Sequence, residues 1–145
     1  MKNQNNTPLV SIIVNCHNGE EYLNDCISSI INQTYKNWEL IFWDNKSTDK
    51  SLEIASSYKD KRIKIFKSKE HTNLGQARKN ALQKAEGDYL AFLDVDDFWE
   101  KEKLKSQIRL FDNKEIGIVF TNSVYFSKKR KKNLYSLNKK FDITT

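Results

Sequence analysis

Glycine and proline are scarce in this 145-residue chain, which contains only four glycines and one proline. Because the glycines are scattered (Gly19, Gly75, Gly87 and Gly117), neither G-x-G-x-x-G nor G-x-x-x-x-G-K-[ST] occurs in the sequence. This absence argues against dinucleotide binding of the Rossmann type and against a P-loop. Any phosphate group that the protein binds must therefore be held in another way.

Cysteines and long apolar segments are also few. Cys16 and Cys26 are too few for a disulfide framework, which favours a reducing, cytoplasmic location. No apolar run approaches the roughly 20 residues that span a bilayer, and the polar N-terminus has no signal-peptide pattern. A hydrophobic content of 38% with 12% aromatic residues is too high for a disordered chain. We therefore expect a small soluble globular domain.

Basic residues gather at the C-terminal end. The net charge is +6, yet residues 1–127 contain equal numbers of basic and acidic residues. The excess lies in a basic run at Lys128–Lys132 and in two further lysines downstream. We expect a polar extension (1–8), one domain (9–127) and a basic segment (128–145). Such a segment is usually solvated, but it is also typical of binding to nucleic acid or to an anionic membrane surface.

Short apolar runs alternate with segments of helical periodicity along the domain. The runs predict strands at 9–14, 39–43, 63–66, 89–93 and 116–126. The intervening segments predict helices over 23–31, around 52–55, over 74–85 and over 104–111. Ser47 and Asp49 are start signals for the second helix, and Asn73 is one for the third. This alternation predicts an α/β fold with a mostly parallel sheet flanked by helices on both faces.

Polar residues follow the predicted strands directly. Asn15 and His17 come after the first strand, Asp44 and Asn45 after the second, and an acidic run after the fourth. Ligands of open α/β sheets bind beyond the carboxyl ends of the strands. These residues therefore mark the expected binding edge, whereas His71 is interpreted as an exposed loop residue without a role.

The acidic run Asp94-Val95-Asp96-Asp97 is the most specific of these features. Three carboxylates within four residues repel one another unless a cation or hydrogen-bond donors balance their charge. One interpretation is that Asp96 or Asp97 caps the next helix and that the others are solvated. The position directly after a buried strand favours the alternative, in which a divalent cation binds these carboxylates together with a diphosphate.

Six separate motifs resemble family 2 glycosyltransferases of the GT-A fold. They follow the family's order and spacing over two-thirds of the chain, and they are Ser11–Leu23, Ser28–Tyr35, Trp38–Asp49, Asn73–Arg78, Ala85–Asp97 and the nearby Trp99. The resemblance implies a nucleotide-sugar donor, with UDP favoured as the nucleotide, and Mg²⁺ or Mn²⁺ as the cofactor.

The resemblance also implies roles for individual residues. Asp96 would ligate the metal, and Asp94 would contact either the ribose or the metal. Four residues after the first two strands would hold the nucleoside, with Arg78 shaping their pocket; they are Asn15, His17, Asp44 and Asn45. The metal would neutralise the charge that develops on the leaving diphosphate.

The sequence also departs from the family pattern. Asn15-Cys16-His17-Asn18 stands in place of the common Pro-Thr-Tyr-Asn, and Asp44-Asn45-Lys46-Ser47 in place of Asp-Asp-Gly-Ser. Both changes leave the identity of the base open. The family's general base, an Asp or Glu that deprotonates the acceptor hydroxyl, is expected beyond residue 145. The chain thus resembles the nucleotide-sugar half of a longer enzyme.

The whole enzyme would transfer a sugar, with inversion, to a glycan or lipid-linked acceptor in bacterial surface polysaccharide synthesis. It would lie in the cytoplasm, and the basic segment 128–145 suggests peripheral contact with the inner face of the membrane. One alternative is a nucleotide-sugar-binding module without catalysis. Another is a binder of nucleic acid or membranes through the basic segment, although the neutral domain argues against a nucleic-acid partner.

Overall fold

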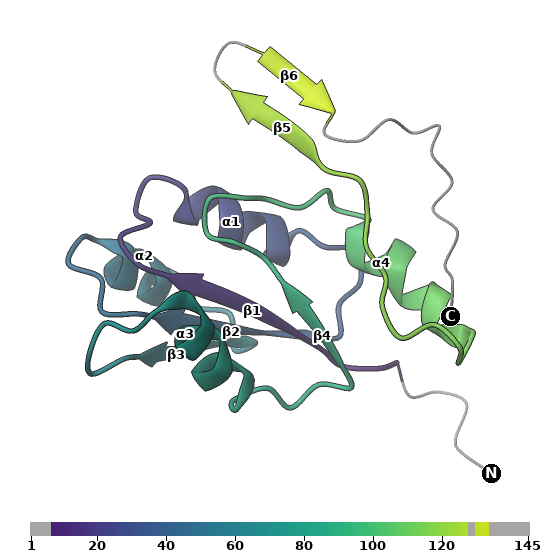
Figure 1. Cartoon of the computed structure of the whole chain (residues 1–145), viewed down its shortest axis with the longest axis horizontal. Helices are drawn as coiled ribbons and strands as arrows, with labels where there is room; N and C mark the ends of the chain where they lie inside the picture. The colour runs from purple at the N-terminus through teal and green to yellow at the C-terminus, as the bar shows by residue number, and fades with distance from the viewer. Residues whose placement is uncertain (1–6, 128–129, 134–145) are drawn as a thin grey trace. The chain divides into compact units, whose positions relative to one another are not determined.

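The first of two compact units is a four-stranded parallel sheet with helices. The computed structural model describes residues 7–127 and 130–133, and the chain divides into Met1–Ser106 and Gln107–Thr145. The strands of the first unit are β1 (Val10–Cys16), β2 (Trp38–Asp44), β3 (Ile63–Lys67) and β4 (Tyr89–Phe92), in the spatial order β3-β2-β1-β4 (Figure 1). The predicted parallel α/β sheet is confirmed.

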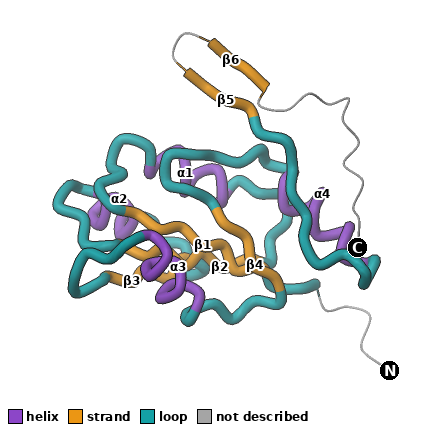
Figure 2. Tube along the Cα trace, in the orientation of Figure 1, coloured by secondary structure: helices purple, strands orange, loops and turns teal. Residues whose placement is uncertain are grey.

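Helices lie on both faces of this sheet (Figure 2). Helices α1 (Leu23–Ile31) and α2 (Ser51–Ser57) lie together on one face, and α3 (Leu74–Leu82) packs on the other against β1 and β2. Helix α4 (Lys103–Ile108) follows β4 in the chain. The side chain of Asn73 caps α3 as predicted, because it accepts a bond from Gln76 N–H at 2.9 Å.

The start of α2 differs in part from the prediction. Asp49 Oδ1 accepts a hydrogen bond of 2.9 Å from the backbone N–H of Ser51, the first residue of the helix. The Ser47 hydroxyl instead accepts a bond from Asn18 N–H at 3.0 Å. Ser47 therefore joins the loops after β1 and β2 and does not cap α2, because the helix begins four residues later than Ser47.

The two central strands form the core of the first unit. Every residue of β2 is buried, and so is every residue of β1 except Asn15. Small side chains on α3 let it approach the sheet closely, where Ala77 and Ala81 pack against Ile13, Ile41 and Trp43. Burial on both faces explains the nearly continuous apolar sequence of these strands.

A buried carboxylate lies near the N-terminal end of β2. Glu39, whose side chain is 6% exposed, pairs with Lys64 Nζ at 2.8 Å. It also accepts bonds from Ser11 Oγ at 2.5 Å and from the backbone N–H of Glu86 at 2.7 Å. Burial opposes ionisation, but the Lys64, Ser11 and Glu86 donors outweigh it and hold the pKa of Glu39 below its ordinary value. Next to this network the backbone passes so close that a Cβ at Gly87 would lie 2.7 Å from Ser11 N.

The strand order has a topological switch point between β1 and β4. The chain runs from β1 to β2 and β3 on one side, and then returns to add β4 on the other side of β1. In open α/β sheets, ligands bind beyond the carboxyl ends of the strands at such a point. The polar residues that follow β1, β2 and β4 are the relevant ones here.

The second unit has little regular structure in its described part. It contains a short 3-10 helix, η1 (Arg109–Asp112), and an antiparallel pair formed by β5 (Val124–Ser127) and β6 (Arg130–Asn133). The predicted strand over 116–126 is wrong for residues 116–123, because only the segment from Val124 onward pairs with a neighbouring strand; Ile118 is 77% exposed.

The basic run that the sequence singles out falls only partly within the structure. Its residues 130–132 belong to β6, whereas 128–129 and 134–145 lie outside the described residues. Predictions about the basic segment therefore stay predictions. Within the described residues no helix is both long enough and apolar enough to cross a membrane.

Candidate functional site

The acidic turn Asp94–Asp97 follows β4 at the carboxyl edge of the sheet. Its backbone closes through a bond from Asp97 N–H to the Asp94 carbonyl at 3.0 Å. Val95 points back toward the loop after β1, where a Cβ on Gly19 would lie only 2.7 Å from its Cγ2. A side chain at position 19 would therefore force Val95 or Cys16 to shift.

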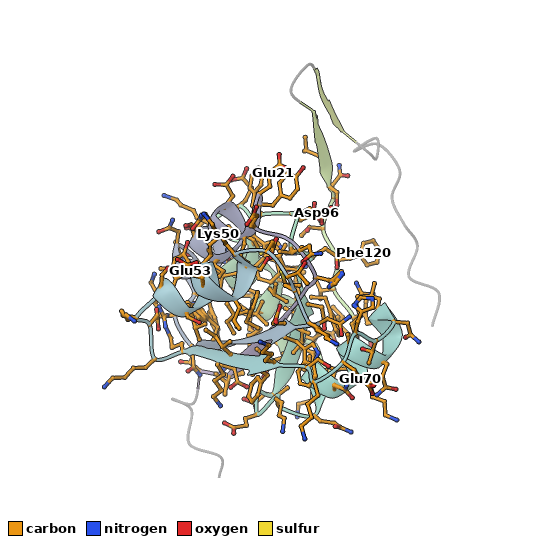
Figure 3. The ribbon with its side chains drawn as sticks, turned by 90° about the vertical axis from the view of Figure 1, so that its left-hand side faces the viewer. Glu21, Lys50, Glu53, Glu70, Asp96 and Phe120 are labelled. Atoms are coloured by element: carbon orange, nitrogen blue, oxygen red, sulfur yellow. The ribbon has the colours of Figure 1, made fainter. Side chains whose placement is uncertain are left out.

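The carboxylates of the turn influence one another. Burial, followed by the charges of Asp96 and Asp94, raises the pKa of Asp97 above its ordinary value. The charge of Glu21 raises the pKa of Tyr22, and the charge of Asp96 adds to the same effect. Glu21 and Asp96 lie on the same side of the first unit (Figure 3). The turn thus concentrates three carboxylates within four residues.

Arg78 brings a positive charge to the turn. Its Nη2 lies 2.8 Å from Asp94 Oδ1, and its guanidinium lies 6.0 Å from the centre of the Phe92 ring. The two side chains are 38% and 61% exposed, so this ion pair adds little stability. Its effect is to join α3 to the acidic turn, which brings together two residues that the sequence places in one pocket.

The donor set of the turn suits a hard divalent cation. Mg²⁺ and Mn²⁺ prefer carboxylate oxygens and commonly bind through one or two of them, with phosphates and waters as the other ligands. Among residues 7–127 and 130–133, no group of three His, Cys, Asp or Glu side chains is arranged to hold a metal by itself. A cation at Asp94 and Asp96 would therefore need oxygens from a bound ligand.

Asp44 lies deeper than the sequence predicts for a ligand-binding residue. It is 0% exposed, and its Oδ1 accepts a bond from Ser47 N–H at 3.2 Å. Its Oδ2 is buried and has no hydrogen-bond partner among the described residues. Lys46, which follows in this loop, has a φ of 63°, a conformation that glycine adopts most easily.

Asn45 binds the loop that connects β3 to α3. Its Oδ1 accepts bonds from Thr72 N–H at 3.1 Å and Thr72 Oγ1 at 3.0 Å, while its Nδ2 donates to the Thr72 carbonyl at 2.7 Å. Asn45 N–H also donates to the Cys16 carbonyl at 2.8 Å. Asn45 therefore fixes three segments of the binding edge, a role that the sequence does not reveal.

Two histidines meet beside Asn45. His17 and His71 have ring centres 4.1 Å apart, with the ring planes tilted by 47°. His71 is exposed in a loop, as expected, but its contact with His17 places it at the binding edge. The sequence does not reveal this contact, because 53 residues and two strands separate the histidines along the chain.

Asn15 lies on the same edge, on the sheet face that α3 covers. It pairs in register with Trp43, and Asn15 Oδ1 and Trp43 Nε1 are both buried without a hydrogen-bond partner among the described residues. A buried acceptor and a buried donor without partners thus lie near the ends of β1 and β2. Buried polar atoms of this kind are rare in folded proteins and are often found at functional sites.

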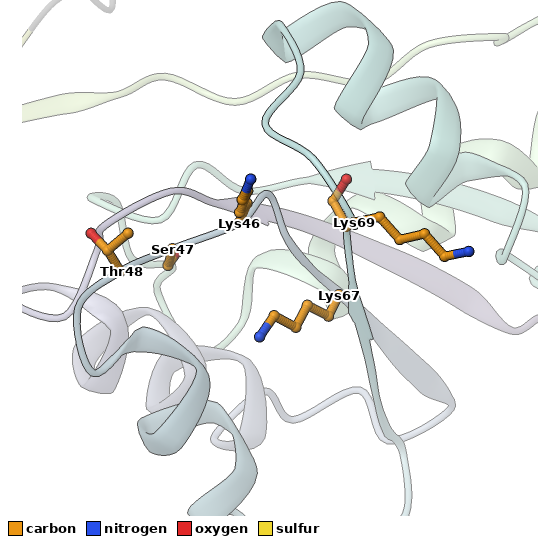
Figure 4. Close-up of a pocket in the computed structure, with 6 residues that line it drawn as sticks. Lys46, Ser47, Thr48, Lys67 and Lys69 are labelled. Atoms are coloured by element: carbon orange, nitrogen blue, oxygen red, sulfur yellow. The ribbon is translucent and has the colours of Figure 1, made fainter.

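A basic hollow lies beyond the ends of β2 and β3. Its volume is about 510 Å³, and it is lined by Lys46, Ser47, Thr48, Lys67, Ser68 and Lys69 (Figure 4). The hollow is formed by the loop after Asn45 and by the end of β3. None of the residues predicted to bind substrate lines it, so it is a neighbouring feature of the edge.

The chain belongs to glycosyl transferase family 2, whose family model matches residues 11–144. An uncharacterized glycosyltransferase of Haemophilus influenzae is 49% identical over 71% of this chain and 42% of its own length. The Escherichia coli UDP-Glc:alpha-D-GlcNAc-diphosphoundecaprenol beta-1,3-glucosyltransferase WfgD is 38% identical over 79% of this chain and 45% of its own length. The chain thus spans less than half the length of these relatives.

Solved structures agree with the fold. The crystal structure of S. aureus TarS 1-349 in complex with UDP-GlcNAc matches with a TM-score of 0.68 and 32% identity, over 71% of this chain and 31% of that chain. Mannosyltransferase PcManGT from Pyrobaculum calidifontis, in complex with GDP-Man and Mn²⁺, matches with a TM-score of 0.69 over 75% of this chain and 34% of that chain. The identity to the mannosyltransferase is 22%, so this likeness concerns the fold alone. The predicted GT-A architecture is confirmed.

Proposed function

We propose that this chain binds a nucleoside diphosphate sugar, with UDP as the nucleotide, together with Mg²⁺ or Mn²⁺. The acidic turn carries the proposal, since it places three carboxylates directly after β4, beside the topological switch point between β1 and β4. A diphosphate and a divalent cation together match such a turn chemically. The proposal is supported by the complex of TarS with UDP-GlcNAc and by the UDP-Glc donor in the name of WfgD.

In this proposal the two sides of the edge hold different parts of the donor. Asp96 and Asp94 would hold the cation, which would supply charge neutralisation for the departing diphosphate. Arg78 would orient Asp94, to which it is already bonded. The nucleoside would bind near Asn15, His17, Asp44 and Asn45, where the oxygens Asn15 Oδ1 and Asp44 Oδ2 are buried and have no hydrogen-bond partner among the described residues.

The reaction that we propose for the whole protein is transfer of the sugar with inversion. The acceptor hydroxyl would attack the anomeric carbon, its proton would pass to a general base, and the bond to the diphosphate would break. We assign that base to no described residue and expect it beyond residue 145. The acceptor would be a glycan or lipid-linked sugar of bacterial surface polysaccharide synthesis, reached at the cytoplasmic face of the membrane.

Calorimetric titration of UDP, GDP and dTDP, each with and without Mn²⁺, tests the donor site. We expect UDP to bind more tightly with Mn²⁺, and Asp96→Asn to abolish the effect of Mn²⁺ while the protein stays folded. Glu53→Gln is the matched control, because Glu53 is exposed on α2, away from the acidic turn (Figure 3). An unchanged Mn²⁺ effect in Asp96→Asn would contradict the proposal. Binding without turnover of any donor by the whole protein would favour the non-catalytic module.

A further inference from the structure

The basic hollow at the ends of β2 and β3 is bordered by two separate segments of the chain. Lys46 belongs to the loop after β2, whereas Lys67 ends β3 and Lys69 follows it (Figure 4). All three lysines are exposed, and none of them forms an ion pair with another residue among those that the structure describes. Their ammonium groups can therefore bind an anion from outside the chain.

Ser68 fixes the backbone between the two lysines at the end of β3. Its N–H donates to the Asp44 carbonyl at 2.8 Å, and its hydroxyl donates to the Glu70 carbonyl at 2.6 Å. Ser68 is buried, whereas Lys67 and Lys69 on either side of it are exposed. The points at which these two lysine side chains leave the backbone are therefore held in place before any ligand binds.

Lys46 has a backbone conformation that does not favour lysine. Its φ of 63° lies in the left-handed region, where residues other than glycine are less stable. The loop is nevertheless held in this conformation, because Asn45 before it is buried and Ser47 N–H after it donates to Asp44 Oδ1 at 3.2 Å. Strained residues of this kind cluster at binding and active sites. An exposed lysine at such a position therefore favours a role in binding over a role in stability.

We propose that the basic hollow binds a phosphate group through Lys46, Lys67 and Lys69. An ammonium group is a compact charge that forms charge-assisted hydrogen bonds with phosphate oxygens. The hydroxyl-bearing Ser47 and Thr48 also line the hollow, and its volume of about 510 Å³ leaves room for the group that carries the phosphate. The proposal does not rest on the donor site, because the diphosphate of the donor is proposed at the acidic turn after β4.

Two sources can supply such a phosphate group. One is a phosphomonoester in solution, and the other is the headgroup of an anionic lipid at a membrane surface. Both present phosphate oxygens to the lysines, so inorganic phosphate and lipid vesicles are the probes that distinguish them. Each lysine close to an anionic surface strengthens binding about fivefold, and salt weakens the effect.

Titration of the ¹⁵N-labelled chain with inorganic phosphate tests the site directly, without nucleotide or metal and at constant ionic strength. We expect the backbone N–H signals of residues 46–48 and 67–69 to shift until they saturate. In the hollow variant, glutamine replaces the three lysines that line the hollow (Lys46→Gln, Lys67→Gln and Lys69→Gln). We expect phosphate to bind this variant at least about tenfold more weakly than it binds the wild type.

A control variant removes the same charge at the opposite end of the sheet. It replaces three exposed lysines that precede β2 or β3 (Lys36→Gln, Lys59→Gln and Lys61→Gln). Because both variants lose three positive charges, a difference between them reports the position of the charges and not their number. The control variant should bind phosphate as the wild type does.

Co-sedimentation with vesicles identifies the source of the phosphate group. The vesicles contain either phosphatidylcholine alone or equal amounts of phosphatidylcholine and phosphatidylglycerol. Both variants retain residues 128–145, so the basic segment contributes equally to each. Weaker binding of the hollow variant than of the control variant to the mixed vesicles would assign the site to a lipid phosphate. Weaker binding of inorganic phosphate alone, with equal vesicle binding, would assign it to a soluble phosphomonoester.

Two results would overturn the proposal. In the first, the hollow variant and the control variant bind both phosphate and vesicles equally. In the second, saturating UDP with Mg²⁺ displaces phosphate from residues 46–48 and 67–69, because the hollow would then belong to the donor site. Failure of the folded wild-type chain to bind UDP would instead refute the proposed function and leave the phosphate titration unaffected.

Lys46→Gly separates binding from stability at the strained position. Glycine adopts a φ of 63° without strain, so the melting temperature of this variant should not fall below that of the wild type. Its affinity for phosphate should nevertheless fall about fivefold, as for the loss of one charged contact. An unchanged affinity for both phosphate and the mixed vesicles would show that Lys46 has no part in the site.

Discussion

Strand β2 carries a buried carboxylate near each of its ends, and the two carboxylates differ in how many hydrogen-bond partners they have. Glu39 near the N-terminal end has a lysine, a hydroxyl and a backbone N–H as partners. Asp44 at the C-terminal end has a single backbone N–H, and its second oxygen has no partner among the described residues. Both residues are almost wholly inaccessible, with exposed fractions of 4% and 0%.

The difference separates an end of β2 whose carboxylate is satisfied within the protein from the end at which we propose that a ligand binds. A buried charge is tolerated when its oxygens are bonded, and it destabilises the fold when they are not. The partners of Glu39 satisfy that requirement within the protein. Asp44 retains an uncompensated oxygen at the edge where ligands of α/β sheets bind, which supports a role for this edge in binding.

The largest effect on stability is expected from Glu39→Gln. The substitution keeps the size of the side chain but removes its negative charge. That charge pairs with Lys64 and accepts hydrogen bonds from Ser11 Oγ and Glu86 N–H. We expect the free energy of unfolding to fall by about 2 kcal/mol, less than for a fully buried pair because Lys64 is partly exposed. Chemical denaturation at neutral pH measures it, and a loss below the experimental error would contradict the structural role of Glu39.

The pH dependence of stability in the same variant gives a second test of the role of Glu39. The pKa of Glu39 is lowered in the folded protein, so its contribution is complete above its ordinary value of 4.5. The contribution is lost as the pH falls through the folded-state pKa. In Glu39→Gln this part of the acid sensitivity should be absent, and parallel acid-unfolding profiles of wild type and variant would contradict the assignment.

Asp44→Asn should change the free energy of unfolding in the opposite direction. The amide can still accept the bond from Ser47 N–H, and the buried charge is removed. We expect the free energy of unfolding to rise by about 1 kcal/mol, because an unpaired neutral group costs less than an unpaired charge. UDP affinity should fall in the same variant if the free oxygen binds the nucleoside. A loss of stability would show that Asp44 is as structural as Glu39.

The smallest effect is expected at the acidic turn. Burial and the charges of Asp96 and Asp94 raise the folded-state pKa of Asp97, so its ionised form is disfavoured in the folded protein. The wild type should therefore gain stability as the pH falls through this pKa, and Asp97→Asn should lack that gain. At neutral pH we expect a stabilisation of about 0.5 kcal/mol, since solvent screens exposed charges. Thermal denaturation over a range of pH values measures both the gain in wild-type stability at low pH and the stabilisation of the variant at neutral pH.

Much of the fold follows from local sequence pattern. The four parallel strands are predicted because each is a short apolar run, and α3 because Asn73 precedes its apolar positions. The predicted strand over 116–126 fails because an apolar run alone does not determine whether a neighbouring strand pairs with it. Pairing is a property of the tertiary structure, which a single segment does not encode.

The site is predictable only where the strands end. The positions of Asn15, Asp44 and Asp94 follow from strand boundaries, whereas the ion pair between Arg78 and Asp94 is not predicted from the sequence. The contact of His71 with His17 and the three bonds between Asn45 and Thr72 depend on how separate loops meet. Such long-range contacts have no local sequence signal.

The close approach of Gly19 and Val95 affects the distance between two parts of the proposed donor site. One of these residues belongs to the loop after β1 and the other to the acidic turn, and a single added methyl group at Gly19 would collide with Val95 at 2.7 Å. The absence of a side chain at Gly19 therefore allows the loop after β1 and the acidic turn to lie close together. A larger side chain at position 19 would push these two loops apart, and with them the residues proposed to hold the nucleoside and those proposed to hold the cation.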